Sequence, residues 1–181
     1  MYRNVLCLVM AGGKGSRYGS PSKIVTNICG KPLIEHIIVN IKPFCRDIIM
    51  AISKYTSSFS EVVKLCIEEV ECIETTGEGY IEDLLFLACS LPKPILIVAG
   101  DIVTHRTVIE DFISKALEID RDVITMTISR NGIEEPIGIS LYRGCGGSWT
   151  NIVYSSTDAI DIDTLEDLEI AKNLCRDVEV V

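Results

Sequence analysis

Leu8-Val9-Met10-Ala11-Gly12-Gly13-Lys14-Gly15-Ser16-Arg17-Tyr18-Gly19 is the stretch from which the fold of this chain can be worked out. The apolar run 5–10 is typical of a buried strand, and it ends at glycines, which can adopt positive φ and expose backbone N–H groups. Lys14, Arg17 and Lys23 add positive charge within a short distance along the chain. Backbone donors and cations at the carboxyl end of a first strand favour the binding of a polyphosphate.

Two common phosphate-binding loops do not match this stretch. A P-loop requires Gly-Lys followed by Ser or Thr, whereas Lys14 precedes Gly15 here. The dinucleotide fingerprint requires its third glycine at the position of Tyr18. Both of these loop classes are therefore excluded.

The composition predicts one compact intracellular domain over residues 1–181. Hydrophobic residues make up 48% of the chain, which is sufficient for a core. The net charge of -9 argues against nucleic acid as a partner, because phosphate-backbone binding requires a basic face. Charged residues interrupt every apolar run of membrane length and no signal peptide is evident, so we expect a cytoplasmic protein without membrane contact.

The 8 cysteines form no C-x-x-C pair, and most lie in apolar runs, as small buried hydrophobic residues do. A zinc site is not expected, because ligand spacing is missing and His36 and His105 are isolated. Cytosolic disulfides are rare outside hyperthermophiles. The absence of glutamine and the frequent isoleucine are compatible with a thermophilic source, so a Cys66–Cys72 disulfide stays open.

Strand and helix alternate along most of the chain. This alternation predicts a single Rossmann-like three-layer α/β/α domain with a mostly parallel (mixed) sheet, covered by helices on both faces. Ligands bind beyond the carboxyl ends of the strands in such sheets. We therefore expect loops 11–23, 75–79 and 100–104 to lie at one rim. The expected strands are 5–10, 47–52, 70–73, 95–99, 123–129, 152–154 and 160–163, and the expected helices are 32–41, 60–68, 80–91, 108–118 and a final one after 164.

Two groups of carboxylates are candidates for a metal site. Asp101 follows the buried strand 95–99 directly, where a hard oxygen ligand facing a triphosphate suits Mg²⁺. The alternative is that Asp101 only caps a turn. Asp161 and Asp163 alternate with isoleucines, which places both on one face of a short strand. Either of them could be a second ligand beside Asp101, or Asp163 or Thr164 could simply cap the final helix.

These motifs resemble the signature of the nucleotidyltransferases with a Rossmann-like fold, the relatives of the molybdenum-cofactor guanylyltransferases. In that family an apolar strand leads into A-G-G-x-x-x-R-x-G, then a lysine, then G-x-P-L, which here is Gly30-Lys31-Pro32-Leu33. The resemblance implies catalysis by Arg17, Lys23 and Asp101, and Mg²⁺ on Asp101 and Asp163. It also implies a nucleotide site made of Ala11, Gly12, Gly13, Lys14, Gly15, Ser16, Arg17, Lys23, Thr76, Gly77, Gly79 and Asp101.

The stretch Thr75-Thr76-Gly77-Glu78-Gly79-Tyr80-Ile81-Glu82-Asp83-Leu84 looks like that of the archaeal-type GTP:adenosylcobinamide-phosphate guanylyltransferases. So do A-G-G-K-G-S-R, the P-x-G-I segment 136–139 and the closing I-D-T-L-E-D-L. This similarity implies transfer of GMP from GTP to adenosylcobinamide phosphate, with release of pyrophosphate. The chain departs from the family at Tyr18, where methionine is commoner, and at Ser20-Pro21-Ser22, which is usually glycine-rich.

Several alternatives remain open. The acceptor could instead be a molybdenum cofactor, a phospholactate or a sugar phosphate, or the chain could be a catalytically silent nucleotide-binding protein. An acceptor groove is expected from segments 133–142 and 144–149. Trp149 could stack on a corrin edge there, but a partly buried anchor or a subunit contact is the simpler interpretation. Strand 152–154 and the apolar tail 178–181 could support a homodimer.

Overall fold

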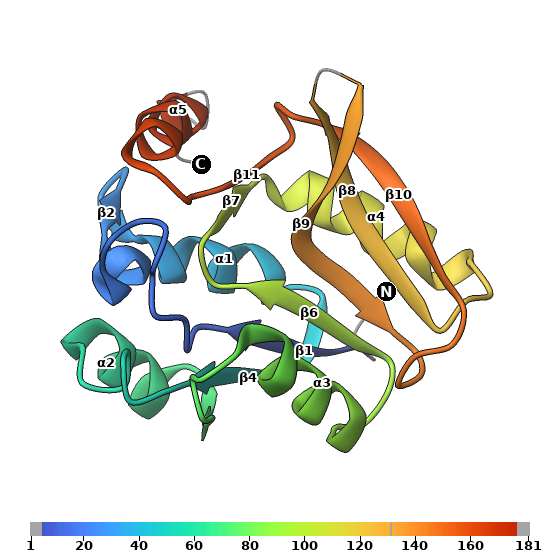
Figure 1. The fold of residues 1–181 in the computed structure, drawn as a ribbon, viewed down its shortest axis with the longest axis horizontal. Coiled ribbons are helices and arrows are strands. Elements are labelled where there is room, and N and C mark those ends of the chain that lie inside the picture. Colours follow the sequence, from blue (N-terminus) through green and yellow to red (C-terminus); the bar gives the residue numbers. More distant parts are fainter. Residues whose placement is uncertain (1–4, 131, 177–181) are drawn as a thin grey trace.

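The computed structural model describes residues 5–130 and 132–176. Its centre is a seven-stranded sheet in the order β10-β8-β9-β6-β1-β4-β5 (Figure 1). All neighbouring strands are parallel except β9, which is antiparallel to both β6 and β8. The mostly parallel, mixed sheet is therefore confirmed. The strands are β1 (Val5–Met10), β4 (Cys45–Ile52), β5 (Glu71–Glu74), β6 (Ile95–Ala99), β8 (Val123–Arg130), β9 (Ile133–Tyr142) and β10 (Trp149–Ser155).

Helices cover both faces of this sheet. The first strand shows the reason, since all six of its side chains are buried and successive ones point to opposite faces. Cys7 and Val9 pack in the core with α1, α2 and α4, whereas Leu6 and Leu8 pack in a second core with α3. The helices are α1 (Leu33–Ile41), α2 (Ser60–Glu68), α3 (Tyr80–Ser90), α4 (Arg106–Glu118) and α5 (Leu165–Arg176).

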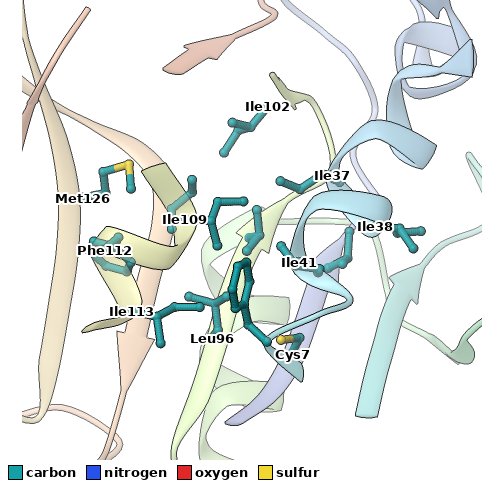
Figure 2. Packing of buried hydrophobic residues seen from close by; sticks show 14 of the residues in the cluster. Cys7, Ile37, Ile38, Ile41, Leu96, Ile102, Ile109, Phe112, Ile113 and Met126 are labelled. Atoms are coloured by element: carbon teal, nitrogen blue, oxygen red, sulfur yellow. The ribbon is translucent and has the colours of Figure 1, made fainter. Parts of the chain in front are cut away.

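The larger core forms where α1 and α4 meet the sheet. Figure 2 shows Phe112 and Ile113 of α4 on one side and Ile41 of α1 on the other, with Leu96 and Cys7 of the strands in the lower part of the view. These side chains are almost completely inaccessible to solvent. The core therefore holds β1 and β6 rigidly, and the loops that follow these two strands start from fixed positions.

A third, smaller core joins the two ends of the chain. Helix α5 lies near β2 (Asn27–Ile28) in Figure 1, where Ile28 and Leu33 pack with Ile162 and Leu168. Strand β2 pairs with β3 (Lys31–Pro32), and a short 3-10 helix, η1 (Pro21–Val25), precedes them. As a result, the segment after residue 158 lies beside the segment that follows the first glycine loop.

Most expected elements form within two residues of their predicted bounds. The prediction omitted β9, which has ten residues, and the short strands β2, β3 and β7 (Ile102–Thr104). It was wrong about strand 160–163: β11 covers Ala159–Asp161, so Asp163 lies beyond its end. The strand near 152–154 lies within β10, at one edge of the sheet. The tail 178–181 lies outside the described residues.

Within the ranges that the structure describes, two disulfides join neighbouring elements. Cys7–Cys45 links β1 to β4, and Cys66–Cys72 links α2 to β5. The disulfide that the sequence left open is therefore present. The expectation that most cysteines are simply small buried hydrophobic residues is wrong for these four, because the parallel strands and the short α2–β5 connection bring them together. Cys89 and Cys145 are free and exposed. In the described part of the chain, no helix has the length and apolar character needed to cross a membrane.

Candidate active site

A cleft of about 510 Å³ opens beyond the carboxyl ends of β1 and β6. Its walls are the glycine loop 11–17, parts of η1, the loop 75–80 and the segment around Asp101. Pro136 and Gly138 of β9, together with Asp161 and Asp163, complete it. This volume is within the range of small-molecule sites. The structure thus brings loops 11–23 and 75–79 to one rim, whereas 102–104 forms the buried strand β7.

The glycine loop is hydrogen-bonded to the protein at Gly12 and open to the cleft at Gly13. Ser53 donates a hydrogen bond from its hydroxyl to the Gly12 carbonyl at 2.7 Å. Gly15 has a φ of +63°, and a side chain there would collide with the Ser20 carbonyl. At Gly13, by contrast, a Cβ would meet nothing within 4 Å among the described residues. The backbone at Gly13 is therefore exposed to the cleft, where its N–H can reach a bound anion.

Lys23 is the most buried cation of the site, with only 6% of its surface exposed. Its Nζ lies 2.6 Å from Asp101 Oδ2 and 3.4 Å from Asp163 Oδ1. Burial alone would lower the pKa of Lys23, but the charges of Asp101 and of the neighbouring carboxylates outweigh it and raise the pKa above its ordinary value. Lys23 is therefore a fixed positive charge at the floor of the cleft.

The other two predicted cations also have carboxylate partners. Arg17 forms an ion pair with Asp163. Lys14 Nζ lies 3.2 Å from Glu78 Oε2 across the cleft mouth, and the same ammonium group lies over the ring of Tyr55. Both pairs are exposed enough to exchange these partners for a bound phosphate at little cost.

Three carboxylates converge opposite these cations. One oxygen from each of Asp101, Asp161 and Asp163 can be chosen so that all three lie within 4.8 Å of one another. Asp161 Oδ1 is buried and has no hydrogen-bond partner among the described residues. Burial, together with the charges of Asp101 and Asp163, raises the pKa of Asp161 to about 7. An all-oxygen cluster with an unpartnered buried oxygen fits a hard divalent cation.

Strand pairing explains how Asp161 and Asp163 come to lie beside Asp101. Strand β11 pairs with β7 so that Asp161 lies opposite Ile102, next to Asp101, and the Ile162 N–H donates to the Asp101 carbonyl at 3.0 Å. Asp161 faces the cluster although the sequence ranked it behind Asp163. The alternating Asp-Ile pattern was the signal, but the pairing with β7 was not foreseen.

Hydrogen bonds at the start of α5 show whether Asp163 or Thr164 caps this helix. The N–H of Asp167 donates to Thr164 Oγ1 at 3.2 Å, and Asp167 Oδ2 accepts hydrogen bonds from the N–H groups of Asp163 and Thr164. This reciprocal arrangement is a capping box at the start of α5. The interpretation of Asp163 as the cap is wrong, because its carboxylate pairs with Arg17 and Lys23.

The loop between β5 and α3 depends on a residue that the sequence did not single out. Asp83 is 8% exposed and accepts hydrogen bonds from the N–H and hydroxyl of Thr76 and from the N–H of Gly77. Burial alone would raise the pKa of Asp83, but these hydrogen bonds outweigh it and the pKa is lowered. Gly77 and Gly79 line the cleft, whereas Thr76 is turned to Asp83 and the described cleft wall contains Thr75 instead.

The predicted acceptor groove is divided between two ends of the sheet. Pro136 and Gly138 line the cleft, as the first part of segment 133–142 should. Trp149, however, pairs with Val123 at the start of β8. Because β8 runs in the same direction as β6, Trp149 lies at the amino ends of these strands, away from the cleft. The loop 144–149 therefore cannot form the groove with them, and Trp149, at 67% exposed, is not a partly buried anchor.

Comparison with known proteins identifies a family whose model matches most of the chain. The family described as the MobA-like NTP transferase domain matches residues 7–157. The chain is 27% identical over 190 residues to an adenosylcobinamide-phosphate guanylyltransferase of Methanocaldococcus jannaschii, covering 93% of this chain and 96% of the relative. It is also 26% identical over 161 residues to the bifunctional protein GlmU of Francisella philomiragia, covering 85% of this chain and 34% of that protein.

Solved structures share the fold at low sequence identity. An inositol-1-phosphate CTP transferase from T. maritima superposes with a TM-score of 0.70 at 11% identity, covering 99% of each chain. A CMP:2-keto-3-deoxy-manno-octonic acid synthetase, solved in complex with CTP, gives a TM-score of 0.69 at 13% identity, covering 96% of this chain and 98% of the other.

Proposed function

The chain belongs to the family of MobA-like NTP transferase domains, and we propose that it transfers GMP from GTP to adenosylcobinamide phosphate with release of pyrophosphate. One observation carries the nucleotidyl-transfer part of this proposal: Lys23 and the three carboxylates meet at the floor of a cleft walled by an open glycine loop. The choice of nucleotide and acceptor is supported by the similarity to the Methanocaldococcus jannaschii guanylyltransferase over nearly the whole of both chains.

The proposed reaction is an in-line displacement at phosphorus. An oxygen of the acceptor's phosphate forms a bond to the α-phosphorus of GTP, and the bond from that phosphorus to the bridging oxygen of the β-phosphate breaks. Pyrophosphate leaves with this electron pair. Because a phosphate monoester is already ionised near neutral pH, no general base is required. Catalysis then depends on positioning the reactants and on neutralising their charge.

The residues of the cleft divide these tasks. The backbone N–H groups of Gly12, Gly13 and Gly15 would bind along the triphosphate. Lys14 and Arg17 would hold the β- and γ-phosphates at the mouth of the cleft. Lys23, deeper and almost completely buried, would lie at the α-phosphate, where charge develops in the transition state.

A divalent metal is part of the proposal, and we propose Mg²⁺. Asp101 and Asp163 would hold it, and Asp161 joins them because its buried oxygen needs a partner. When bound, the metal would supply positive charge that stabilises the phosphate oxygens and the departing pyrophosphate. Binding of the metal ion requires Lys23 and Arg17 to leave these carboxylates and to contact phosphate groups instead. The metal and the nucleotide should therefore bind together.

The test is pyrophosphate release by the purified protein with Mg²⁺ and GTP, with and without adenosylcobinamide phosphate. ATP and CTP run in parallel, and a chelator removes the metal in a further sample. We expect release only when GTP, the corrinoid and Mg²⁺ are all present. Binding of GTP without release would refute the corrinoid as acceptor and direct the search to molybdenum-cofactor, phospholactate or sugar-phosphate acceptors. Absence of any nucleotide binding would refute the proposed function as a whole.

A catalytically silent nucleotide-binding protein is the remaining alternative. A protein that only binds a nucleotide does not need a buried lysine beside three carboxylates, since burying such charges is costly unless they are used. The clustering of Lys23 with Asp101, Asp161 and Asp163 therefore favours an enzyme.

A further inference from the structure

The loop 75–79 turns its hydrogen-bond donors into the protein. Asp83, at the first turn of α3, accepts from the Thr76 N–H at 3.2 Å, the Thr76 hydroxyl at 2.8 Å and the Gly77 N–H at 2.9 Å. One buried carboxylate thus occupies three donors of this loop, two of them on the backbone.

The flanking donors are occupied as well. The N–H and the hydroxyl of Thr75 both donate to the Ile52 carbonyl, at 2.7 and 3.0 Å. The N–H of Glu78 donates to Thr76 Oγ1 at 3.2 Å. From residue 75 to residue 78, every backbone N–H therefore has a partner inside the protein.

The acceptors of the same loop remain available. Among the described residues, none donates a hydrogen bond to the carbonyl oxygens of Thr76, Gly77 and Glu78. Gly77 and Glu78 line the cleft, and the Glu78 carboxylate adds a negatively charged acceptor at its mouth. A base that enters beside residues 75–78 therefore meets hydrogen-bond acceptors, and the backbone donors of the cleft wall begin only at Gly79 and Tyr80, at the start of α3.

Nucleobases differ in what they present to such a surface. Guanine carries two adjacent donors on one edge, N1–H and the 2-amino group, whereas adenine has an acceptor nitrogen at N1 and no amino group at C2. Cytosine likewise has an acceptor at N3. A site built from acceptors rejects a base without the matching donors, because buried polar groups would be left unpaired.

We propose that Asp83 is a positioning residue that makes the loop 75–79 an acceptor surface and thereby selects guanine. This inference rests on the proposed function, in which a nucleoside triphosphate occupies the cleft. Asp83 lies at the cleft wall, but both of its carboxylate oxygens accept hydrogen bonds from the loop. It acts by holding the donors of Thr76 and Gly77 away from it.

Binding of GTP, ITP and ATP to the wild-type protein tests the inference without any variant. Inosine keeps N1–H but lacks the 2-amino group, so we expect ITP to bind about 10-fold more weakly than GTP. ATP lacks both donors and should bind on the order of 10²–10³-fold more weakly. Equal affinities for the three nucleotides would overturn the inference. If pyrophosphate release still depended on the acceptor, the proposed function would stand.

Asp83→Asn tests the role of the carboxylate, because an amide keeps the size but loses one acceptor. We expect the GTP/ATP affinity ratio to fall at least about 10-fold, whereas binding of inorganic triphosphate, which contacts only the glycine loop and its cations, stays unchanged. Asp120→Asn, the same substitution at an exposed position after α4, is the matched control and should keep the wild-type ratio. A uniform loss of affinity for all three nucleotides would mean a merely structural role and would overturn the inference. Should Asp83→Asn not fold, the wild-type comparison can still overturn the inference, because equal affinities for GTP, ITP and ATP would mean that the loop does not select guanine.

Discussion

Lys23 lies between Asp101 and Asp163, so the group expected to bind phosphate and the groups expected to bind metal neutralise each other in this structure. The lysine occupies the place of a cation among three carboxylates. At the scale of single residues, the site is therefore a set of exchangeable ion pairs. A metal ion without a nucleotide must compete with the Lys23 ammonium group, which pairs with two of the three carboxylates.

The first prediction concerns this competition. Lys23→Met should raise the affinity for Mn²⁺ in the absence of nucleotide by at least about 10-fold, because the competing charge is removed. Turnover should fall on the order of 10²–10³, because charge on the α-phosphate is no longer neutralised. Paramagnetic resonance of free Mn²⁺ measures the first quantity and pyrophosphate release the second. Lys42→Met, at an exposed surface pair, is the control. Weaker Mn²⁺ binding by Lys23→Met would contradict the competition.

The second prediction separates the two glycine positions of the loop. Gly13→Ala meets open space, so its free energy of unfolding should stay within about 0.5 kcal/mol of wild type. GTP affinity should fall by about 10- to 100-fold, because an added methyl in a close-fitting site costs about 1–3 kcal/mol. Gly15→Ala should instead destabilise the fold, because of its positive φ and its contact with Ser20. Urea unfolding and GTP titration distinguish the two. Unchanged GTP affinity in Gly13→Ala would show that the triphosphate does not lie against this residue.

Among the elements, α5 has the clearest link to the site, because its capping box begins one residue after Asp163. The cap fixes the backbone from which the Asp163 carboxylate reaches Arg17 and Lys23. The stretch Asp163 to Asp167 therefore has two roles. Its backbone and Thr164 start a helix, and one carboxylate belongs to the cleft.

The third prediction follows from this link. Thr164→Val should lower the free energy of unfolding by about 1 kcal/mol, since the N-cap hydrogen bond is lost. It should also weaken GTP binding in the presence of Mg²⁺, since Asp163 loses its fixed position. Denaturant unfolding and GTP titration provide the two readouts. Thr107→Val, at an exposed position of α4, should change neither. Loss of stability without loss of nucleotide affinity would show that Asp163 does not depend on the cap.

At the scale of the whole molecule, covalent links supplement the packed layers. The described disulfides join β1 to β4 and α2 to β5, on the same half of the sheet as the glycine loop. Cross-links of this kind stabilise a protein mainly by restricting its unfolded chain, and the effect increases with the length of the closed loop.

The fourth prediction uses the shorter link. Under non-reducing conditions, Cys66→Ser combined with Cys72→Ser should lower the free energy of unfolding by about 2 kcal/mol, as expected for a short closed loop. The same pair of substitutions should make little difference in the presence of a reductant, because the wild-type bond is then also absent once the chain unfolds. Urea unfolding with and without dithiothreitol makes the comparison. A deficit that persists in reductant would mean that packing of the sulfur atoms, and not the bond, accounts for the stability.

The alternation of strands and helices was readable from local patterns, because apolar periodicity, glycine and proline act within a few residues. Strand β1, helix α2 and strand β6 form at the bounds expected from the sequence. Strand β9 was missed because its first four residues are exposed and include two glutamates, so it lacks the apolar run of a buried strand. Its place in the sheet depends on pairing with β6, which is distant in sequence, as well as with the adjacent strand β8.

The sequence by itself determined the fold class and the phosphate-binding character of the first loop, since a strand that ends at glycines with nearby cations is a local property. Only the tertiary structure decided which carboxylates meet. Pairing of β11 with β7 brings Asp161 beside Asp101 across nearly sixty residues, and a helix cap frees the Asp163 side chain for Lys23. Likewise, Asp83 controls the loop 75–79 only because the start of α3 folds back on it. Such contacts join residues whose neighbours in sequence carry no sign of them.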